Sequence, residues 1–221
     1  MIDKIFESLE RAVADIHDGA TVMIGGFGNA GMPSALIDAL IVQGARDLTI
    51  VNNNAGNGET GLAALLKAKR VRKIICSFPR QADSHHFDAL YRAGEIELEL
   101  TPQGNLAERI RAAGAGIGGF FTPTGYGTQL AEGKETRLIN GRHYVLESPI
   151  HADFALIKAL RGDRWGNLVY RKTARNFGPI MAMAAKTAIA QVQQVVALGE
   201  LDPEVIVTPG IFVQRIVREA A

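Results

Sequence analysis

The sequence has little of several features that would place it in a special class of protein. Cys76 is its only cysteine, so an internal disulfide is excluded and a reducing compartment fits. The 24 basic residues nearly balance the 23 acidic ones, and a net charge of +1 gives no electrostatic reason to bind nucleic acid or an anionic membrane. No apolar stretch reaches the length of a membrane span, and the N-terminal residues lack the apolar core of a signal peptide. These absences predict a soluble, cytoplasmic protein.

Hydrophobic residues are plentiful, at 47% of a 221-residue chain, which is enough for a sizeable core. Strand-like and helix-like apolar patterns alternate through the first half of the chain. Helices are expected over residues 3–17, 33–43, 62–69, 82–93 and 105–113, and strands over residues 20–24, 48–52, 73–77 and 95–100. The sequence therefore predicts one α/β domain over residues 1–221, built on an open, mainly parallel doubly wound sheet.

The pattern changes after residue 113. Residues 114–128 contain six glycines and a proline, which is unusual for a routine connection. The pair Asn140-Gly141 is typical of a type I′ turn, so a hairpin insertion is expected there. Further strands are expected over residues 152–159, 187–197 and 205–208, with a helix over residues 178–186.

The most informative stretch, residues 18–33, joins a short apolar strand to the start of a helix. Its turn consists of Gly25, Gly26, Phe27, Gly28, Asn29, Ala30 and Gly31. Glycines let a ligand approach the backbone closely, and free amides at a helix N-terminus favour an anion or a carbonyl oxygen. A ligand-binding loop is therefore predicted over residues 25–31. The alternative is a tight strand-to-helix crossing that needs the glycines only for its own geometry.

The same loop also has the glycine spacing of dinucleotide-binding folds. Gly26, Gly28 and Gly31 satisfy G-x-G-x-x-G. That fingerprint requires an acidic residue at the tip of the second strand, where this chain has three asparagines, and the nearby Asp47 precedes the strand. The sequence thus disfavours a nicotinamide cofactor and an oxidoreductase.

No metal site is expected. The adjacent histidines His85 and His86 should point about 100° apart on a helix, which makes them a poor pair of ligands. Both are expected to be surface residues, and no other group of His, Cys or Asp residues has the spacing of metal ligands.

Several longer motifs cover essentially the whole chain. They are Asp-Gly at 18–19, Gly-Gly-Phe at 25–27 followed by Gly31 and Pro33, Asn-Asn-Ala-Gly at 53–56, and residues 101–116, 120–128, 152–159 and 171–190. Together these motifs resemble those of the A subunits of 3-oxoacid CoA-transferases. In that family a glutamate carboxylate attacks the donor thioester, an enzyme–CoA thioester forms, and CoA then passes to the acceptor acid.

The resemblance implies that this chain carries half of an active site. The family's glutamate lies in a Ser-Glu-Asn-Gly motif of the B subunit, which neither Asn57-Gly58 nor Asn140-Gly141 provides, and Glu59 is not expected to replace it. The implied assembly is two A and two B subunits, with coenzyme A as a substrate thioester and no permanently bound cofactor. The implied reaction moves CoA from succinyl-CoA to 3-oxoadipate, with acetoacetate as the alternative acceptor. A non-catalytic interaction module is the alternative of a different class.

Gln103 is the main candidate for chemistry within this chain. It lies where an expected strand gives way to a helix, at the edge where open α/β sheets bind ligands. The resemblance implies that its amide helps to form an oxyanion hole, and that residues 25–31 contact CoA. From spacing alone, a glutamine that caps the following helix is the favoured alternative.

Five further residues are candidates for substrate binding: Asn53, Asn54, Arg80, Phe120 and Tyr126. The asparagines could donate hydrogen bonds to substrate carbonyls, or could instead stabilise their own loop. Arg80 could pair with the distal carboxylate of 3-oxoadipate, or be a solvated loop residue. The two aromatics could form a mobile wall that excludes water, or pack against the partner protein.

Overall fold

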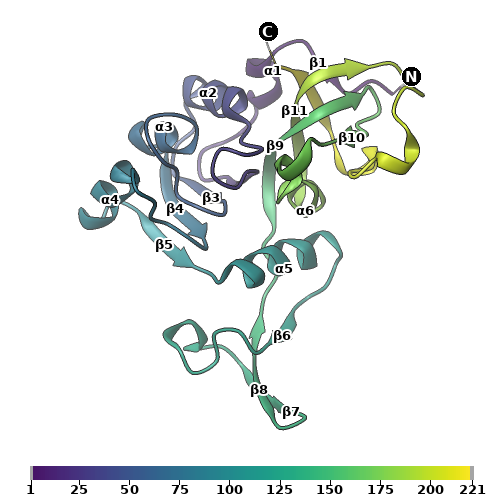
Figure 1. The fold of residues 1–221 in the computed structure, drawn as a ribbon. Coiled ribbons are helices and arrows are strands. Elements are labelled where there is room, and N and C mark those ends of the chain that lie inside the picture. The colour runs from purple at the N-terminus through teal and green to yellow at the C-terminus, as the bar shows by residue number, and fades with distance from the viewer. Residues whose placement is uncertain (1, 220–221) are drawn as a thin grey trace.

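A nine-stranded sheet organises the computed structural model, which describes residues 2–219 (Figure 1). In spatial order its strands are β1 (Ile5–Phe6), β12 (Arg215–Arg218), β11 (Ala185–Val196), β9 (Ala152–Asp163), β2 (Thr21–Ile24), β3 (Leu48–Val51), β4 (Val71–Cys76) and β5 (Glu97–Leu100), with β10 (Leu168–Val169) paired to β9. All neighbours along this order are parallel, and only β10 runs antiparallel to its partner. The predicted α/β class and mainly parallel sheet are confirmed.

Helices cover both faces of this sheet. One face carries α1 (Leu9–Val13), α2 (Ser34–Gln43), α3 (Leu62–Lys67) and α4 (His85–Arg92), and the other carries α5 (Gln103–Gly114) and α6 (Gly178–Ala184). Side chains alternate between the faces, as the pleat of a strand requires. In β2, Val22 and Ile24 join the core under α1–α4, whereas Met23 joins the core under α5 and α6. Among residues 2–219, no helix has both the length and the apolar character needed to cross a membrane.

The strand order reverses at the centre of the sheet. From β2 the chain adds β3, β4 and β5 on one side, then crosses to β9 on the other side of β2. In open α/β sheets, ligands bind outside the carboxyl ends of the strands at such a switch point. The loop of residues 25–31 follows β2 directly, so the topology puts it at this position.

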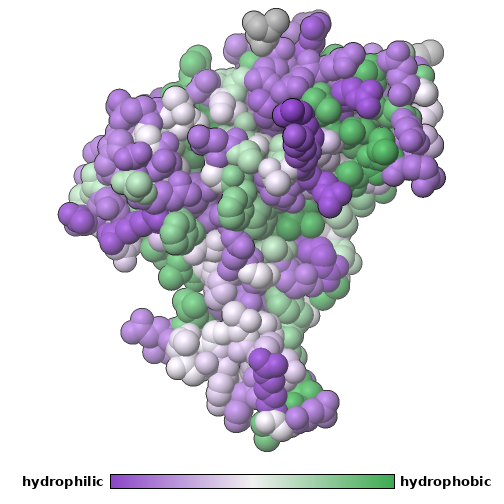
Figure 2. Space-filling view, viewed as in Figure 1, coloured by the Kyte–Doolittle hydropathy of each residue, from purple (hydrophilic) through white to green (hydrophobic). Residues whose placement is uncertain are grey.

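A second sheet projects from the main body (Figures 1 and 2). It contains β6 (Phe120–Thr122), β8 (Arg142–Glu147) and β7 (Thr136–Ile139), in that order, and the short 3-10 helix η1 (Gln129–Ala131) precedes β7. Asn140 and Gly141 join β7 to β8 with φ of 50° and 77°, both positive as a type I′ turn requires. The predicted hairpin insertion is therefore confirmed.

Both ends of the chain differ from the expected pattern. The single helix expected over residues 3–17 is wrong, because Ile5 and Phe6 form β1 against β12 and α1 begins only after Ser8. The Ser8 side chain accepts a hydrogen bond from the Arg11 amide, which starts the helix there.

The strand expected over residues 205–208 is also wrong. That segment contains the end of the 3-10 helix η3 (Pro203–Val205) and a single bridge between Thr208 and Leu168. The last strand is instead β12, which follows the 3-10 helix η4 (Gly210–Phe212) and lies between β1 and β11.

Candidate active site

The loop of residues 25–31 closes on itself at the switch point. The Phe27 amide donates to the Ala30 carbonyl at 3.0 Å, and the Ala30 amide returns a bond to the Phe27 carbonyl at 3.2 Å. Gly26, Gly28 and Gly31 have φ of 127°, 57° and 77°, values that side chains disfavour. The conformation of the turn therefore accounts for all three glycines of the G-x-G-x-x-G pattern.

The loop is fixed from outside by one asparagine that the sequence did not single out. Asn176 follows the 3-10 helix η2 (Lys172–Arg175). Its Oδ1 accepts a hydrogen bond from the Gly26 amide at 3.2 Å, and its Nδ2 donates to the Ala30 carbonyl at 2.9 Å. At Gly31 the fit is so close that an added Cβ would lie 2.5 Å from the Ala174 carbonyl oxygen. The 172–176 segment therefore determines the shape of the loop.

The helix that follows the loop offers fewer free amides than its position suggested. The Leu36 amide, in the first turn of α2, donates to Gln191 Oε1 at 3.2 Å, and this glutamine comes from β11. No side chain caps α2 at Pro33. The N-terminus of α2 therefore has one amide fewer to offer to a ligand than its position suggested.

A cavity of about 390 Å³ lies beside the loop and is called the edge cavity here. Its lining residues are Phe27, Asn53, Ser77, Phe78, Gln81 and Gln103. Asn53 Oδ1 accepts hydrogen bonds from Ser77 Oγ and from Gln103 Nε2, both at 2.8 Å. Because an amide nitrogen carries two N–H groups, Gln103 keeps one donor beyond its bond to Asn53. The edge cavity thus brings Phe27, Asn53 and Gln103, all predicted site residues, to one place.

Gln103 is the first residue of α5, and the hydrogen bond of its side-chain amide goes to Asn53 instead of to the backbone of its own helix. The alternative interpretation, a glutamine that caps this helix, is therefore wrong. Its side chain reaches across to Asn53, which follows β3, so the amide is held at the carboxyl edge of the sheet.

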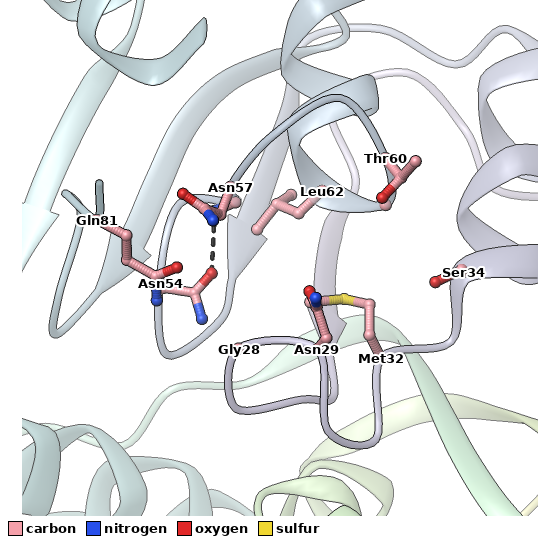
Figure 3. A pocket seen from close by; sticks show the side chains of 11 residues that line it. Gly28, Asn29, Met32, Ser34, Asn54, Asn57, Thr60, Leu62 and Gln81 are labelled. Carbon is pink, nitrogen blue, oxygen red and sulfur yellow. Dashed lines mark hydrogen bonds between the residues drawn. The ribbon is translucent and has the colours of Figure 1, made fainter. Parts of the chain in front are cut away.

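A second cavity of about 250 Å³, called the loop cavity, lies between the loop of residues 25–31 and residues 54–62 (Figure 3). It is lined by Gly28, Asn29, Met32, Ser34, Asn54, Gly56, Asn57, Thr60, Gly61, Leu62 and Gln81. Asn54 Oδ1 accepts a hydrogen bond from the Gly56 amide at 3.0 Å, whereas Asn54 Nδ2 is buried and has no partner among residues 2–219. A buried donor without an acceptor costs about 1–3 kcal/mol, so this nitrogen favours a ligand oxygen. Gln81 lines both cavities.

Neither cavity has a charged group in its lining. All the side chains that line them are amides, hydroxyls, a thioether or hydrocarbons. The nearby thiol of Cys76 is buried, and burial raises its pKa to about 12, so it is protonated at neutral pH and is a poor nucleophile. These cavities can therefore bind and polarise an acyl group through hydrogen bonds, but their linings contain no carboxylate or thiolate that could attack it.

The sequence profile of the family described as Coenzyme A transferase matches residues 6–219. The chain belongs to the coenzyme A transferase family. It is 76% identical to the A subunit of 3-oxoadipate CoA-transferase of Pseudomonas putida, over 98% of this chain and 94% of that protein. It is 50% identical to the A subunit of a probable succinyl-CoA:3-ketoacid coenzyme A transferase of Bacillus subtilis, over 99% of this chain and 91% of that protein.

Solved coenzyme A transferases have the same fold. An acyl-CoA transferase from Escherichia coli O157:H7, solved as a thioester complex with CoA, superposes with a TM-score of 0.84 at 23% identity, covering 98% of this chain and 47% of that one. Glutaconate coenzyme A-transferase from Acidaminococcus fermentans superposes with the same TM-score of 0.84 at 20% identity, covering 97% of this chain and 75% of that one. The open parallel sheet is therefore that of this transferase family.

Three of the predicted substrate residues lie outside the two cavities. Arg80 Nε donates to Asp88 Oδ1 of α4 at 2.6 Å and is 54% exposed, so the arginine already has a carboxylate partner. Phe120 belongs to β6 of the projecting sheet, and Tyr126 lies in the turn between β6 and η1. Tyr126 stacks on His143 with ring centroids 4.4 Å apart.

The expectation that His85 and His86 diverge is wrong. Their ring centroids are 4.2 Å apart, and both Nε2 atoms approach the carboxylate of Glu59. Sequence reasoning considered the histidines and the glutamate separately, because nothing in the spacing of 59 and 85 indicates that the loop before α3 contacts the start of α4.

Proposed function

We propose that this chain is the A subunit of a heteromeric transferase that moves CoA from succinyl-CoA to 3-oxoadipate. The observation that carries the proposal is the uncharged edge cavity, where Gln103 and Asn53 offer amide donors and no lining side chain carries a carboxylate. The choice of acceptor is supported by relatives at 76% and 70% identity, each named as the A subunit of a 3-oxoadipate CoA-transferase. Coenzyme A takes part as a substrate thioester, and no permanently bound cofactor is proposed.

The chemistry divides between two kinds of polypeptide. A glutamate of the B subunit attacks the thioester carbon, and negative charge builds on the thioester oxygen. The free N–H of Gln103 stabilises that oxygen, while Asn53 holds the Gln103 amide in position. Such a donor acts only if it is already oriented when the charge develops, and a 2.8 Å bond to a side chain that is 3% exposed provides that orientation.

The loop of residues 25–31 and Asn54 bind the remaining parts of the substrates. The loop presents backbone without side chains at Gly26 and Gly28, so an extended chain such as that of CoA can lie close to it. Asn54, with its unpaired Nδ2, donates to a carbonyl or carboxylate oxygen in the loop cavity. Much of the CoA molecule contacts the B subunit.

A transferase that uses acetoacetate is the second candidate. It is favoured by the relatives near 50% identity, which are named as A subunits of succinyl-CoA:3-ketoacid coenzyme A transferases. A panel of 3-oxo acids, assayed with succinyl-CoA and the assembled heteromeric complex, distinguishes the two by kcat/KM. We expect 3-oxoadipate to be the better acceptor.

The decisive experiment separates the two polypeptides. The present chain, purified alone, should have no transferase activity. It should gain activity when the B subunit is added, as a complex with two copies of each polypeptide by light scattering. Incubation with succinyl-CoA followed by borohydride or hydroxylamine should label a glutamate of the added protein. Labelling of Glu59, or of any other carboxylate in this chain, contradicts the proposal, as does full activity of this chain alone.

A further inference from the structure

A compact group of metal-ligating side chains lies next to the loop cavity. Glu59 belongs to the loop before α3, and His85 and His86 are the first two residues of α4. Glu59 Oε1 is 2.7 Å from His85 Nε2, and Glu59 Oε2 is 3.1 Å from His86 Nε2. One ligand atom from each of the three residues can be chosen so that all lie within 4.8 Å of one another. Two imidazoles and a carboxylate are a donor set typical of zinc sites.

The backbone holds this group together before any ion binds. The carbonyl oxygen of Asp83 accepts a hydrogen bond from the Gly58 amide at 3.0 Å, and Asn57 Oδ1 accepts one from the Asp83 amide at 2.9 Å. These two bonds join the loop that carries Glu59 to the turn that leads into α4. The three side chains are therefore brought together by fixed main chain rather than by chance contact of long side chains.

The hydrogen bonding of His85 leaves the lone pair of its Nε2 atom facing the Glu59 carboxylate. Its Nδ1 lies 3.1 Å from the Asp83 carbonyl oxygen, which can only accept, so Nδ1 carries the proton. In the neutral ring Nε2 is then an acceptor, and it faces a carboxylate oxygen 2.7 Å away. Two acceptors this close need a cation between them, either a second proton on the ring or a metal ion. A carbonyl that orients the far nitrogen of a histidine is the usual outer partner of a metal-bound imidazole.

Small side-chain movements convert the present arrangement into a coordination shell. Bonds of ~2.0–2.1 Å in a tetrahedron separate the ligand atoms by about 3.3 Å. The present ligand atoms lie within 4.8 Å of one another. Lys67 Nζ, 2.8 Å from Glu59 Oε2, competes for the same carboxylate, but this lysine is 62% exposed and can turn into solvent.

We propose that Glu59, His85 and His86 form a binding site for one divalent transition-metal ion, with Zn²⁺ the best match to the donors. Solvent completes the coordination, because the Glu59 and His85 side chains are each 54% exposed. Asn57 and Thr60, on either side of Glu59, line the loop cavity. The ion therefore ties one wall of that cavity to α4.

The test is titration of the full-length chain, without a histidine tag and stripped with EDTA, with Zn²⁺ by calorimetry or against a chromogenic chelator. We expect one ion per chain, and at least tenfold weaker binding in His86→Ala and in Glu59→Gln. His151→Ala, which removes another exposed histidine, should leave the affinity unchanged. Circular dichroism confirms that each variant is folded.

A spectroscopic readout identifies the ligands directly. Co²⁺ at the site should give visible absorption bands of a nitrogen- and oxygen-ligated ion, and these bands should be lost in a His85→Ala, His86→Ala double variant. Stoichiometric binding that survives in the double variant overturns the proposal, as does a wild-type chain that binds no more tightly than His86→Ala.

Discussion

The edge cavity and the projecting sheet were both candidates for contact with substrate, and they are built in opposite ways. In the edge cavity, Asn53 is 3% exposed and its oxygen accepts bonds from two neighbours. On the projecting sheet, Leu138 is 64% exposed and the burial of β7 is slight along its whole length. The first region is held by contacts within the chain, whereas the second presents apolar side chains to solvent.

This difference separates what the chain does alone from what it leaves to a partner. A side chain held by buried hydrogen bonds is already oriented for a reaction, and its position does not depend on assembly. An exposed apolar strand gains most of its burial only when another surface covers it. The edge cavity is therefore complete within this chain as a part of the proposed site, and the role of the projecting sheet depends on the proposed B subunit. Four substitutions test this division.

The largest effect is expected from Gly31→Ala. The new methyl group would lie 2.5 Å from the Ala174 carbonyl oxygen, at a residue with φ of 77°. Overpacking costs about 1–3 kcal/mol and a left-handed side chain about 1–2 kcal/mol, so the free energy of unfolding should fall by roughly 2–5 kcal/mol in urea titrations. Gly28→Ala is the matched control. Its φ of 57° is also positive, but an added Cβ there would meet no neighbouring atom within 4 Å. Equal losses in both variants would mean that the 172–176 segment does not hold the loop.

Gln103→Ala should have the next largest effect, and on rate instead of stability. Loss of one oxyanion donor lowers kcat by roughly a hundredfold or more, equivalent to about 2.7–4 kcal/mol. The heteromeric complex should still assemble, since the side chain bonds within this chain to Asn53. Gln129→Ala, an exposed glutamine of η1 in the projecting region, should leave kcat unchanged. Near-wild-type turnover of the assembled Gln103 variant would refute the role of this amide.

The sequence predicted most reliably what depends on neighbours along the chain. Strands β2, β3 and β4 were apparent as short apolar runs, and the turn at Asn140-Gly141 follows from the φ values those two residues tolerate. The strand β12 was missed because its four residues include two arginines, and its pairing with Ile5 and Phe6 joins the two ends of the chain. The same pairing overrode the helical pattern near residue 5.

The site shows the same limit. The positions of Gln103 and Asn53 after strands predicted that both lie at one edge of the sheet, whereas a chemical role for Gln103 came only from the family resemblance. Asn176 was missed, since its bond to the Gly26 amide spans 150 positions and no local rule relates them. The Glu59, His85 and His86 group was missed because the packing of a loop against a helix start decides it. Long-range contacts among polar side chains are thus the part that local patterns did not reveal.

Arg80→Ala should produce a smaller and selective effect. If the guanidinium leaves Asp88 to bind the distal carboxylate of 3-oxoadipate, its loss should raise KM for that acid by about 10- to 150-fold, the equivalent of about 1.5–3 kcal/mol. KM for a monocarboxylic 3-oxo acid should hardly change. The exposed pair with Asp88 contributes only about 0.2–1 kcal/mol to stability, so folding should be unaffected. Asp88→Asn is the control, because it frees Arg80 without removing it. Equal increases in KM for both acids would show that Arg80 does not bind the distal carboxylate of 3-oxoadipate.

The smallest effect is expected from Tyr126→Leu, and it bears directly on the projecting sheet. Tyr126 and His143 stack with an interplanar angle of 1°, and such a pair contributes about 0.5–1.5 kcal/mol beyond its buried area. In the isolated chain the substitution should therefore lower the free energy of unfolding by no more than that amount, with no change in the edge cavity.

Hydrogen exchange compares the two regions directly. Amides of β6, β7 and β8 should exchange quickly in the isolated chain and slowly in the heteromeric complex, whereas those of β2 and β3 should exchange slowly in both. Tyr126→Leu should speed exchange in the projecting sheet alone. If that sheet exchanges slowly in the isolated chain, it is as complete as the edge cavity, and the division between the two regions is wrong.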